Sequence, residues 1–384
     1  MTTDLAAGRR PARIRTGLFL TLYCAAIFLA LDFVYSTFIY HHGSRTLARI
    51  RNPVYDHGFV PNIGVVERWG QVDYRLYTNS LGFKDAKIRD VPAVSDIRRV
   101  VVIGDSFTEA IGLNFDDTFA GMLQQAGLGA SPKTEFLNAG VSGYSATLYL
   151  RKIKSLIDSG VKFDEVLVAL DAGEIPRESS QFFCFDDDPA YAKYCNTDSE
   201  AILPVPVTTT ESFEARIKRH FIVTDTTRRL IKFTVENWWR TRIRKSDALS
   251  GVVESSIATA WPTKEREIDP QLPPLGVAGG IMRAQKHMQA LADLLAAKGI
   301  ALTVSVHPWP AQLSLDDRHS RAVDIWRPFC AKNCKALIDL FPTFFAYKDA
   351  HPADWYDRLF IHGDVHYSVE GNRVMYRELA KHLL

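Results

Sequence analysis

The chain has 384 residues, enough for one large domain or two small ones, and its composition of 47% apolar and 23% charged residues is ordinary for a globular protein. A net charge of +2 gives no indication of nucleic-acid binding. The sequence contains no Walker-type phosphate loop, no dinucleotide-binding fingerprint and no zinc-spaced Cys/His cluster, so neither a cofactor nor a metal is expected.

The N-terminus predicts a membrane anchor. Residues 1–15 are polar and carry four arginines, whereas residues 16–40 are almost wholly apolar, with Asp32 as the only charge. About 20 apolar residues suffice to cross a bilayer as a helix. We therefore expect a cytoplasmic tail at 1–15 and an uncleaved transmembrane signal anchor at 16–40, with a cleaved signal peptide or a buried core helix as alternatives. Because the arginines precede the span, the rest of the chain is expected outside the cytoplasm.

The cysteines are consistent with that location. Cys24 lies inside the apolar stretch, and the other four form two pairs that are close in sequence. In an oxidising compartment we expect the disulfides Cys184–Cys195 and Cys330–Cys334, with four free thiols as the alternative.

Residues 41–97 form a juxtamembrane segment, in which residues 72–77 predict an edge strand. From residue 98 onward, strands and helices alternate. Apolar runs predict strands at 98–103, 134–137, 165–170, 300–306 and 336–340, and helices are expected near 116–126, 145–159 and 277–298. Such alternation implies an α/β domain at 98–384, with a central parallel sheet of about five strands and right-handed crossovers.

The first of these strands ends in Gly104-Asp105-Ser106. Its β-branched residues 100–103 are typical of a strand buried on both faces. The Ser106 hydroxyl is therefore expected at the carboxyl edge of a central strand, where open α/β sheets bind their ligands. Ser106 is a candidate nucleophile; the alternative is that it only caps a helix.

Residues 176–276 interrupt the alternation. Within them, residues 211–245 predict a basic helical stretch that includes Trp238 and Trp239. We expect a packed helical insertion with a solvated basic face. A lid or glycan-binding element and a contact with an anionic membrane are alternatives.

Asp364 and His366 lie in a loop before the last expected helix. A carboxylate two residues before a histidine can supply a general base and the partner that orients it. A serine nucleophile needs both, because its free hydroxyl reacts weakly at neutral pH. A structural loop histidine is the alternative.

Three sequence blocks together resemble the SGNH, or GDSL-type, hydrolase superfamily: Gly104-Asp105-Ser106, the block from Asn138 to Tyr144, and Asp364-Val365-His366. The resemblance implies a flavodoxin-like three-layer α/β sandwich with Ser106, His366 and Asp364 as a catalytic triad. It also implies that the backbone N–H groups of Ser106 and Gly143 form an oxyanion hole. The Asp-x-His spacing resembles a membrane-anchored branch of the bacterial envelope, whose members acetylate or deacetylate polysaccharides.

One position departs from the superfamily's pattern. An asparagine after the third strand usually completes the oxyanion hole, and the aligned residue here is Gly173. Either a backbone N–H near Gly173 substitutes for it, or the activity is modest, or the site has changed its task. Loss of one such donor typically costs about 10²–10³ in kcat.

The resemblance implies a serine-dependent ester hydrolase, of the carbohydrate esterase type, that acts on acyl groups of envelope or exported glycans. The enzyme would be a single-pass protein of the inner membrane with a periplasmic catalytic domain, and with polysaccharide-export or acetylation proteins as partners. An O-acyltransferase that uses the same triad is one alternative, since the acyl-enzyme step is common to both. A catalytically weakened glycan-binding scaffold subunit is another.

Overall fold

The computed structural model describes residues 10–39, 48–70, 72–195, 248–255, 261–262 and 272–384, together with single positions between 220 and 235. The chain divides into two compact units, one formed by Met1–Gly43 with Val207–Ser246 and the other by Ser44–Pro206 with Asp247–Leu384. The basic stretch expected at 211–245 lies almost wholly outside the described residues, so the prediction made for it stays a prediction.

Helix α1 (Arg10–Val34) and the π-helix that follows it (Tyr35–Ile39) belong to the first unit. The 23-residue stretch Arg15–Thr37 is long and apolar enough to cross a membrane. Asp32 is buried there, because its carboxylate accepts hydrogen bonds from the backbone N–H groups of Val223 and Thr224 and from the Thr224 hydroxyl. The only charge of the apolar stretch therefore has partners within its own unit.

The second unit is built on an eight-stranded mixed sheet with the order β10-β9-β8-β6-β7-β5-β4-β3. The strands predicted from the sequence are its five parallel members, which pair as β10-β9-β8-β6-β7. In chain order their arrangement is 2-1-3-4-5, which is the flavodoxin-like order that was expected. These strands are β6 (Arg98–Ile103), β7 (Thr134–Asn138), β8 (Glu165–Leu170), β9 (Ala301–Val306) and β10 (Ala336–Asp339).

Three antiparallel strands extend this sheet beyond β7, namely β3 (Gly64–Trp69), β4 (Val72–Thr78) and β5 (Lys84–Asp85). The sheet is therefore larger than the expected five strands, and it begins upstream of residue 98. The strand predicted at 72–77 exists as β4, but it is not an edge strand because β3 pairs outside it. A separate hairpin is formed by β1 (Arg49–Asn52) and β2 (Asp56–Phe59).

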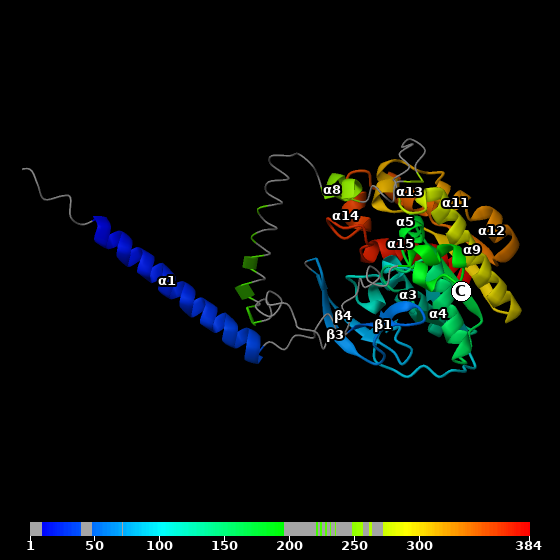
Figure 1. Ribbon diagram of the computed structural model, residues 1–384, viewed down its shortest axis with the longest axis horizontal. Helices are drawn as coiled ribbons and strands as arrows, with labels where there is room; N and C mark the ends of the chain where they lie inside the picture. The colour runs from blue at the N-terminus through cyan, green and yellow to red at the C-terminus, as the bar shows by residue number, and fades with distance from the viewer. Residues whose placement is uncertain are drawn as a thin grey trace, which may run out of the picture. The chain divides into compact units, whose positions relative to one another are not determined.

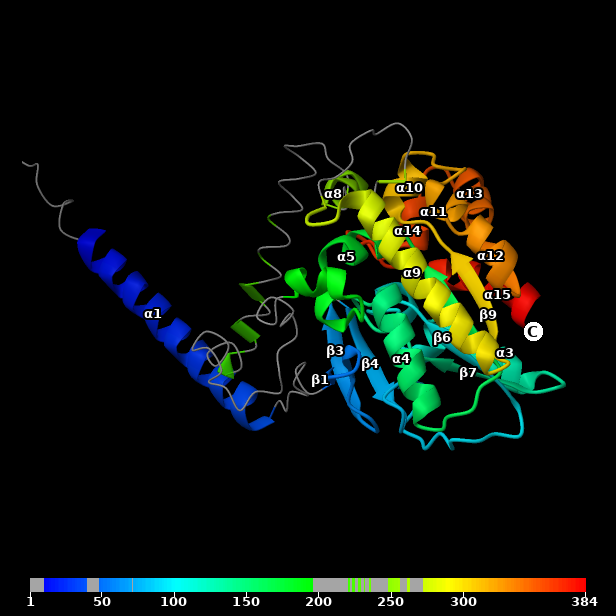
Figure 2. The same ribbon diagram turned by 45° about the vertical axis from the view of Figure 1, so that its right-hand side comes forward.

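Helices cover both faces of the sheet, which gives the predicted three-layer sandwich (Figures 1 and 2). On one face, α9 (Gly276–Ala297) packs against α4 (Ala146–Asp158) and α5 (Glu174–Ser180). On the other face, α3 (Phe119–Gly129) packs against the C-terminal α15 (Val369–Leu383). The shorter helices are α2 (Ser106–Glu109), α8 (Ala248–Ser255), α10 (Pro310–Ser314), α11 (Arg321–Asp324), α12 (Arg327–Asn333), α13 (Phe341–Ala350) and α14 (Trp355–Leu359), with 3₁₀ turns at Phe115–Asp117, Phe183–Phe185 and Pro189–Tyr194.

The parallel strands β6, β7 and β8 are buried along almost their whole length, as strands covered on both faces must be. Their carboxyl ends meet at one edge of the sheet, and the loops that follow them carry the candidate site. Both predicted disulfides, Cys184–Cys195 and Cys330–Cys334, are present, and Cys24 is free.

Candidate active site

Ser106 is the first residue of α2, two residues after β6 ends. The residue that caps this helix is Asp105, whose side chain accepts a hydrogen bond of 2.9 Å from the backbone N–H of Phe107. The alternative interpretation, in which Ser106 itself is the cap, is therefore wrong. The Ser106 hydroxyl remains available for another partner.

That partner is His366. Its Nε2 lies 2.8 Å from Ser106 Oγ, and its Nδ1 lies 2.5 Å from Asp364 Oδ1. The serine and the histidine are 260 residues apart in sequence, and they meet because the loop before α15 returns to the edge of the sheet where β6 ends. A separation of about 2.6–3.2 Å is suitable for proton transfer between a nucleophile and its base. The contact that the sequence predicts is present.

Asp364 is held in its ionised form. Burial disfavours the carboxylate, but the hydrogen bond with the His366 ring and the attraction of that ring outweigh the burial and lower the pKa of Asp364. Oδ1 also accepts the backbone N–H of His366 at 2.9 Å. The carboxylate thus fixes the ring orientation and leaves Nε2 directed to Ser106.

Trp69 is a further member of this group, and nothing in the sequence singled it out. Its Nε1–H donates to Asp364 Oδ2 at 2.7 Å, and its ring meets the His366 ring edge-on, with 5.3 Å between the centroids. Trp69 is the last residue of β3 and precedes Asp364 by 295 residues. Because the sequence does not mark β3 as part of the sheet, its end could not be placed beside the loop at residue 364.

Gly143 lies in the loop after β7 with φ of +87°, a conformation that residues with side chains rarely adopt. The peptide that precedes it is held from both sides. The N–H of Ser142 donates to Glu109 Oε2 at 2.7 Å, and the carbonyl oxygen of Ser142 lies 2.8 Å from His57 Nε2. In a planar trans peptide, the Ser142 carbonyl and the Gly143 N–H point in opposite directions. The contact with His57 therefore fixes the direction of the Gly143 N–H.

The hairpin β1–β2 supplies this support. His57 Nδ1 lies 2.5 Å from Asp56 Oδ2, so both nitrogens of the ring face oxygens that accept hydrogen bonds, and the geometry fits a ring protonated on both. Arg49 of β1 forms an ion pair of 2.5 Å with Glu109, the residue that holds Ser142. His57, Arg49 and Glu109 were not singled out from the sequence, because no motif connects residues 49–57 with the loop after β7.

Gly173 caps the N-terminus of α5 after β8. Its N–H donates to Asp171 Oδ1 at 2.6 Å, so this donor is already engaged. The expectation that this group itself substitutes for the missing asparagine side chain is therefore unsupported. The position remains next to the site, because Asp171 also lies near His307, with 4.0 Å between Oδ2 and Nε2.

Aromatic rings form a wall beside the triad. The Phe107 ring contacts the rings of His307, Trp309, His366 and Tyr367 at centroid distances of 5.0 to 5.3 Å. Burial lowers the pKa of His307 to about 4, which keeps this histidine neutral at neutral pH. Burial also raises the pKa of Asp105 to about 6, with a contribution from Asp171 and opposition from the Arg177 cation.

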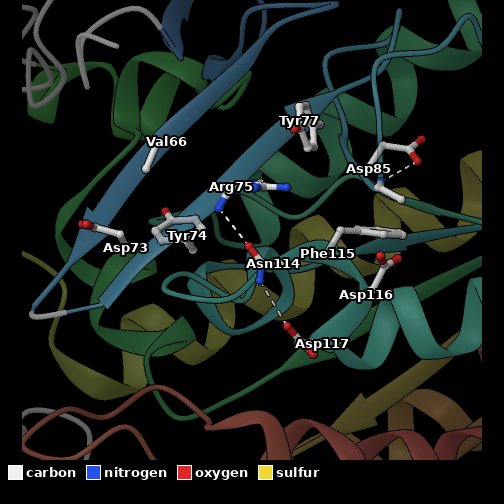
Figure 3. A pocket seen from close by; sticks show the side chains of 11 residues that line it. Val66, Asp73, Tyr74, Arg75, Tyr77, Asp85, Asn114, Phe115, Asp116 and Asp117 are labelled. Carbon is white, nitrogen blue, oxygen red and sulfur yellow. Dashed lines mark hydrogen bonds between the residues drawn. The ribbon is translucent and has the colours of Figure 1, made fainter. Parts of the chain in front are cut away.

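A separate open pocket of about 650 Å³ lies between the β3–β4 hairpin and the turn at 114–117 (Figure 3). Asn114 bridges its two sides, since it accepts the backbone N–H of Arg75 and donates to Asp117. The lining residues include none of the triad: Val66, Asp73, Tyr74, Arg75, Tyr77, Asp85, Ala86, Asn114, Phe115, Asp116 and Asp117. In the described part of the chain, no group of three or more His, Cys, Asp or Glu side chains could hold a metal ion.

Neither a family model nor a curated protein matches this sequence. In fold, the chain is similar to a lipolytic protein of the G-D-S-L family from Desulfitobacterium hafniense, with 13% identity, coverage of 74% of this chain and 98% of that chain, and a TM-score of 0.37. It is also similar to an acetylxylan esterase from Geobacillus stearothermophilus, with 10% identity, coverage of 76% and 95%, and a TM-score of 0.37. Another acetyl xylan esterase has 16% identity, coverage of 74% and 100%, and a TM-score of 0.38.

Proposed function

We propose that this chain is a serine-dependent ester hydrolase of the SGNH type. The observation that carries the proposal is the hydrogen-bonded line from Ser106 Oγ through His366 to Asp364. A serine hydroxyl paired with an oriented imidazole is the arrangement that activates oxygen for attack on an acyl carbon. The same geometry argues against the scaffold alternative, because a site without catalysis has no need of this alignment.

In the proposed mechanism, Ser106 Oγ attacks the acyl carbon while its proton passes to His366 Nε2. The carbonyl electron pair moves to the oxygen, and the N–H groups of Ser106 and Gly143 stabilise the resulting oxyanion. Collapse of this intermediate expels the alcohol, which takes the proton from His366. Water, deprotonated by His366, then attacks the acyl-enzyme, and the acid leaves as Ser106 recovers its proton. Asp364 stabilises the imidazolium in both halves of the reaction.

The proposed substrates are acyl groups on envelope or exported glycans, and the proposed location is the periplasmic side of an inner membrane. The single apolar helix near the N-terminus, the arginines before it and the two disulfides support the location. The Asp-x-His spacing of Asp364 and His366 supports the glycan class. If a sugar hydroxyl replaces water in the second half-reaction, the same residues make the enzyme an O-acyltransferase in a polysaccharide-acetylation complex.

The test uses the full chain purified in detergent. Acetate release is measured from p-nitrophenyl acetate and from an acetylated glycan, with and without an unacetylated glycan as acceptor. We expect release that the Ser106→Ala and His366→Ala substitutions reduce by about 10⁴-fold or more. Acetyl transfer to the added glycan would identify the transferase. Turnover that survives Ser106→Ala in a folded protein would overturn the proposal.

A further inference from the structure

We infer that Arg177 supplies the oxyanion donor that the missing asparagine would have provided. The inference rests on the proposed function and assigns the guanidinium a direct contact with the developing oxyanion. Three features support it: the space beside Gly173, the two loops that Arg177 joins, and the N–H donors that Arg177 has left.

Arg177 occupies the space that a side chain at position 173 would need. A Cβ built on Gly173 would lie 3.1 Å from Arg177 Nη2 and 3.0 Å from Cζ2 of the Trp309 ring. Residue 173 caps α5, and Arg177 lies four residues later on the same helix. Helical side chains lean back toward the N-terminus, so residue 177 covers the surface above residue 173. Glycine at 173 thus makes room for the guanidinium.

The guanidinium also joins the two loops that carry the other oxyanion donors. Nη2 lies 2.8 Å from Asp105 Oδ2, and Nη1 donates to the carbonyl oxygen of Tyr144 at 3.3 Å. Asp105 directly precedes Ser106, and Tyr144 directly follows Gly143. A group that bridges these two positions lies beside the place where the N–H groups of Ser106 and Gly143 would meet a substrate oxygen.

Arg177 has the chemical capacity for this role. A guanidinium carries five N–H donors, and these two contacts leave several of them uncommitted. Burial opposes its charge, but Asp105 and Asp171 raise the pKa of Arg177, which stays cationic. The side chain is 17% exposed, so it retains an open side toward a ligand. A charged donor forms stronger hydrogen bonds to an oxyanion than an amide does.

Two different assignments compete with a donor role for Arg177. In the first, Arg177 is no more than a clamp between the two loops. In the second, the donor is Trp309, whose Nε1–H is buried and has no hydrogen-bond partner among the described residues. Each assignment predicts its own set of results from the substitutions below.

The experiment measures kcat and KM of the full chain for p-nitrophenyl acetate, after circular dichroism has shown that each variant is folded. We expect Arg177→Ala to lower kcat by about 10²–10³-fold with KM changed less than threefold. Gly173→Asn alone should also lower kcat, because its side chain collides with Arg177. In the double variant Arg177→Ala/Gly173→Asn, the asparagine can enter the vacated space, and we expect kcat at least tenfold above that of Arg177→Ala.

Two controls isolate the donor role. Arg98→Ala removes an arginine that pairs with Glu165 at the opposite end of β6, and kcat should not change. Trp309→Phe keeps an aromatic ring, removes Nε1–H and should retain kcat within threefold. Inhibition by a phosphonate analogue of the tetrahedral intermediate should weaken in Arg177→Ala in parallel with kcat/KM.

The inference is overturned if folded Arg177→Ala retains kcat within threefold of the wild type, or if its loss lies wholly in KM. It also fails if Trp309→Phe takes the 10²-fold loss, or if the double variant does not recover and phosphonate binding is unchanged in Arg177→Ala. Wild-type turnover that depends on Ser106 but not on Arg177 leaves the proposed function standing alone. Absence of any Ser106-dependent turnover removes both.

Discussion

Asp364 is fixed from two directions, by the imidazole of His366 and by the indole of Trp69. The tryptophan donates to the oxygen that the histidine does not use, so each carboxylate oxygen has a donor. A hydrogen bond to a charged group is worth about 1.5–3 kcal/mol. At the residue scale, the orientation of the catalytic histidine is thus expected to depend on a side chain contributed by β3.

We predict that Trp69→Phe lowers kcat by roughly 10–100-fold, which corresponds to loss of one such hydrogen bond. The phenyl ring still packs on His366, so KM should change little. The measurement is steady-state ester hydrolysis, with Trp326→Phe as a matched control because Trp326 is buried beside α12. Unchanged kcat in Trp69→Phe would show that the indole N–H is not needed to hold Asp364.

His57 is predicted to act through the peptide between Ser142 and Gly143. His57→Leu removes the donor to the Ser142 carbonyl, and the Gly143 N–H then loses its fixed direction. We expect kcat to fall by about 10-fold or more, with partial recovery in His57→Gln, whose amide can still donate. Equal losses in His57→Leu and His57→Gln would indicate that the ring only fills space.

At the scale of elements, the β1–β2 hairpin and α2 hold the loop after β7 through Glu109. This carboxylate is buried, pairs with Arg49 and accepts the N–H of Ser142. Burial opposes its ionisation, but Arg49 and Lys84 outweigh the burial and lower the pKa of Glu109. A carboxyl group whose pKa is lower in the folded state stabilises the fold above its unfolded pKa of about 4.3, and this stabilisation is lost as the pH falls below that value.

We therefore predict that Glu109→Gln lowers the free energy of unfolding by about 3–5 kcal/mol at pH 7, because Arg49 is left without its buried partner. The difference from the wild type should shrink between about pH 5 and pH 3, where the wild-type carboxylate becomes protonated. Urea unfolding at several pH values measures both quantities. Glu370→Gln, at a surface ion pair with Arg373, serves as the control and should cost less than about 1 kcal/mol.

The sequence was informative where a single strand reports its own environment. The β-branched residues of β6 and the apolar runs of β7 to β10 predict buried parallel strands, and the structure has all five of them. The contact between Ser106 and His366 was predictable because parallel strands and the last helix converge on one edge.

The antiparallel extension was less accessible. β5 has only two residues, Lys84–Asp85, and β3 shows no clear alternation of buried and exposed residues, so neither carries a period-2 signal. The roles of Trp69, His57 and Arg177 depend on contacts between segments far apart in the chain. Such contacts leave no local pattern in one sequence, and only the folded structure brings these residues together.

At the scale of the whole molecule, the apolar helix, the arginines before it and the disulfides predict one topology. A phosphatase reporter that folds only after export, fused after Leu384, should be active. In the unreduced, denatured full chain, a thiol reagent should label Cys24 alone, and after reduction it should label all five cysteines. Quantitative labelling of Cys184, Cys195, Cys330 and Cys334 before reduction, or an inactive exported reporter, would contradict this topology.

The central claim is that Ser106 is a nucleophile activated by His366, and covalent trapping tests it most directly. The full chain is incubated with a p-nitrophenyl phosphonate, and intact-mass and peptide mass spectrometry then locate the adduct. We predict one phosphonyl group per chain on Ser106, no adduct in Ser106→Ala, and labelling slowed by at least 10³-fold in His366→Ala. An adduct that persists in Ser106→Ala, or labelling of Ser106 at an unchanged rate in His366→Ala, would contradict the claim.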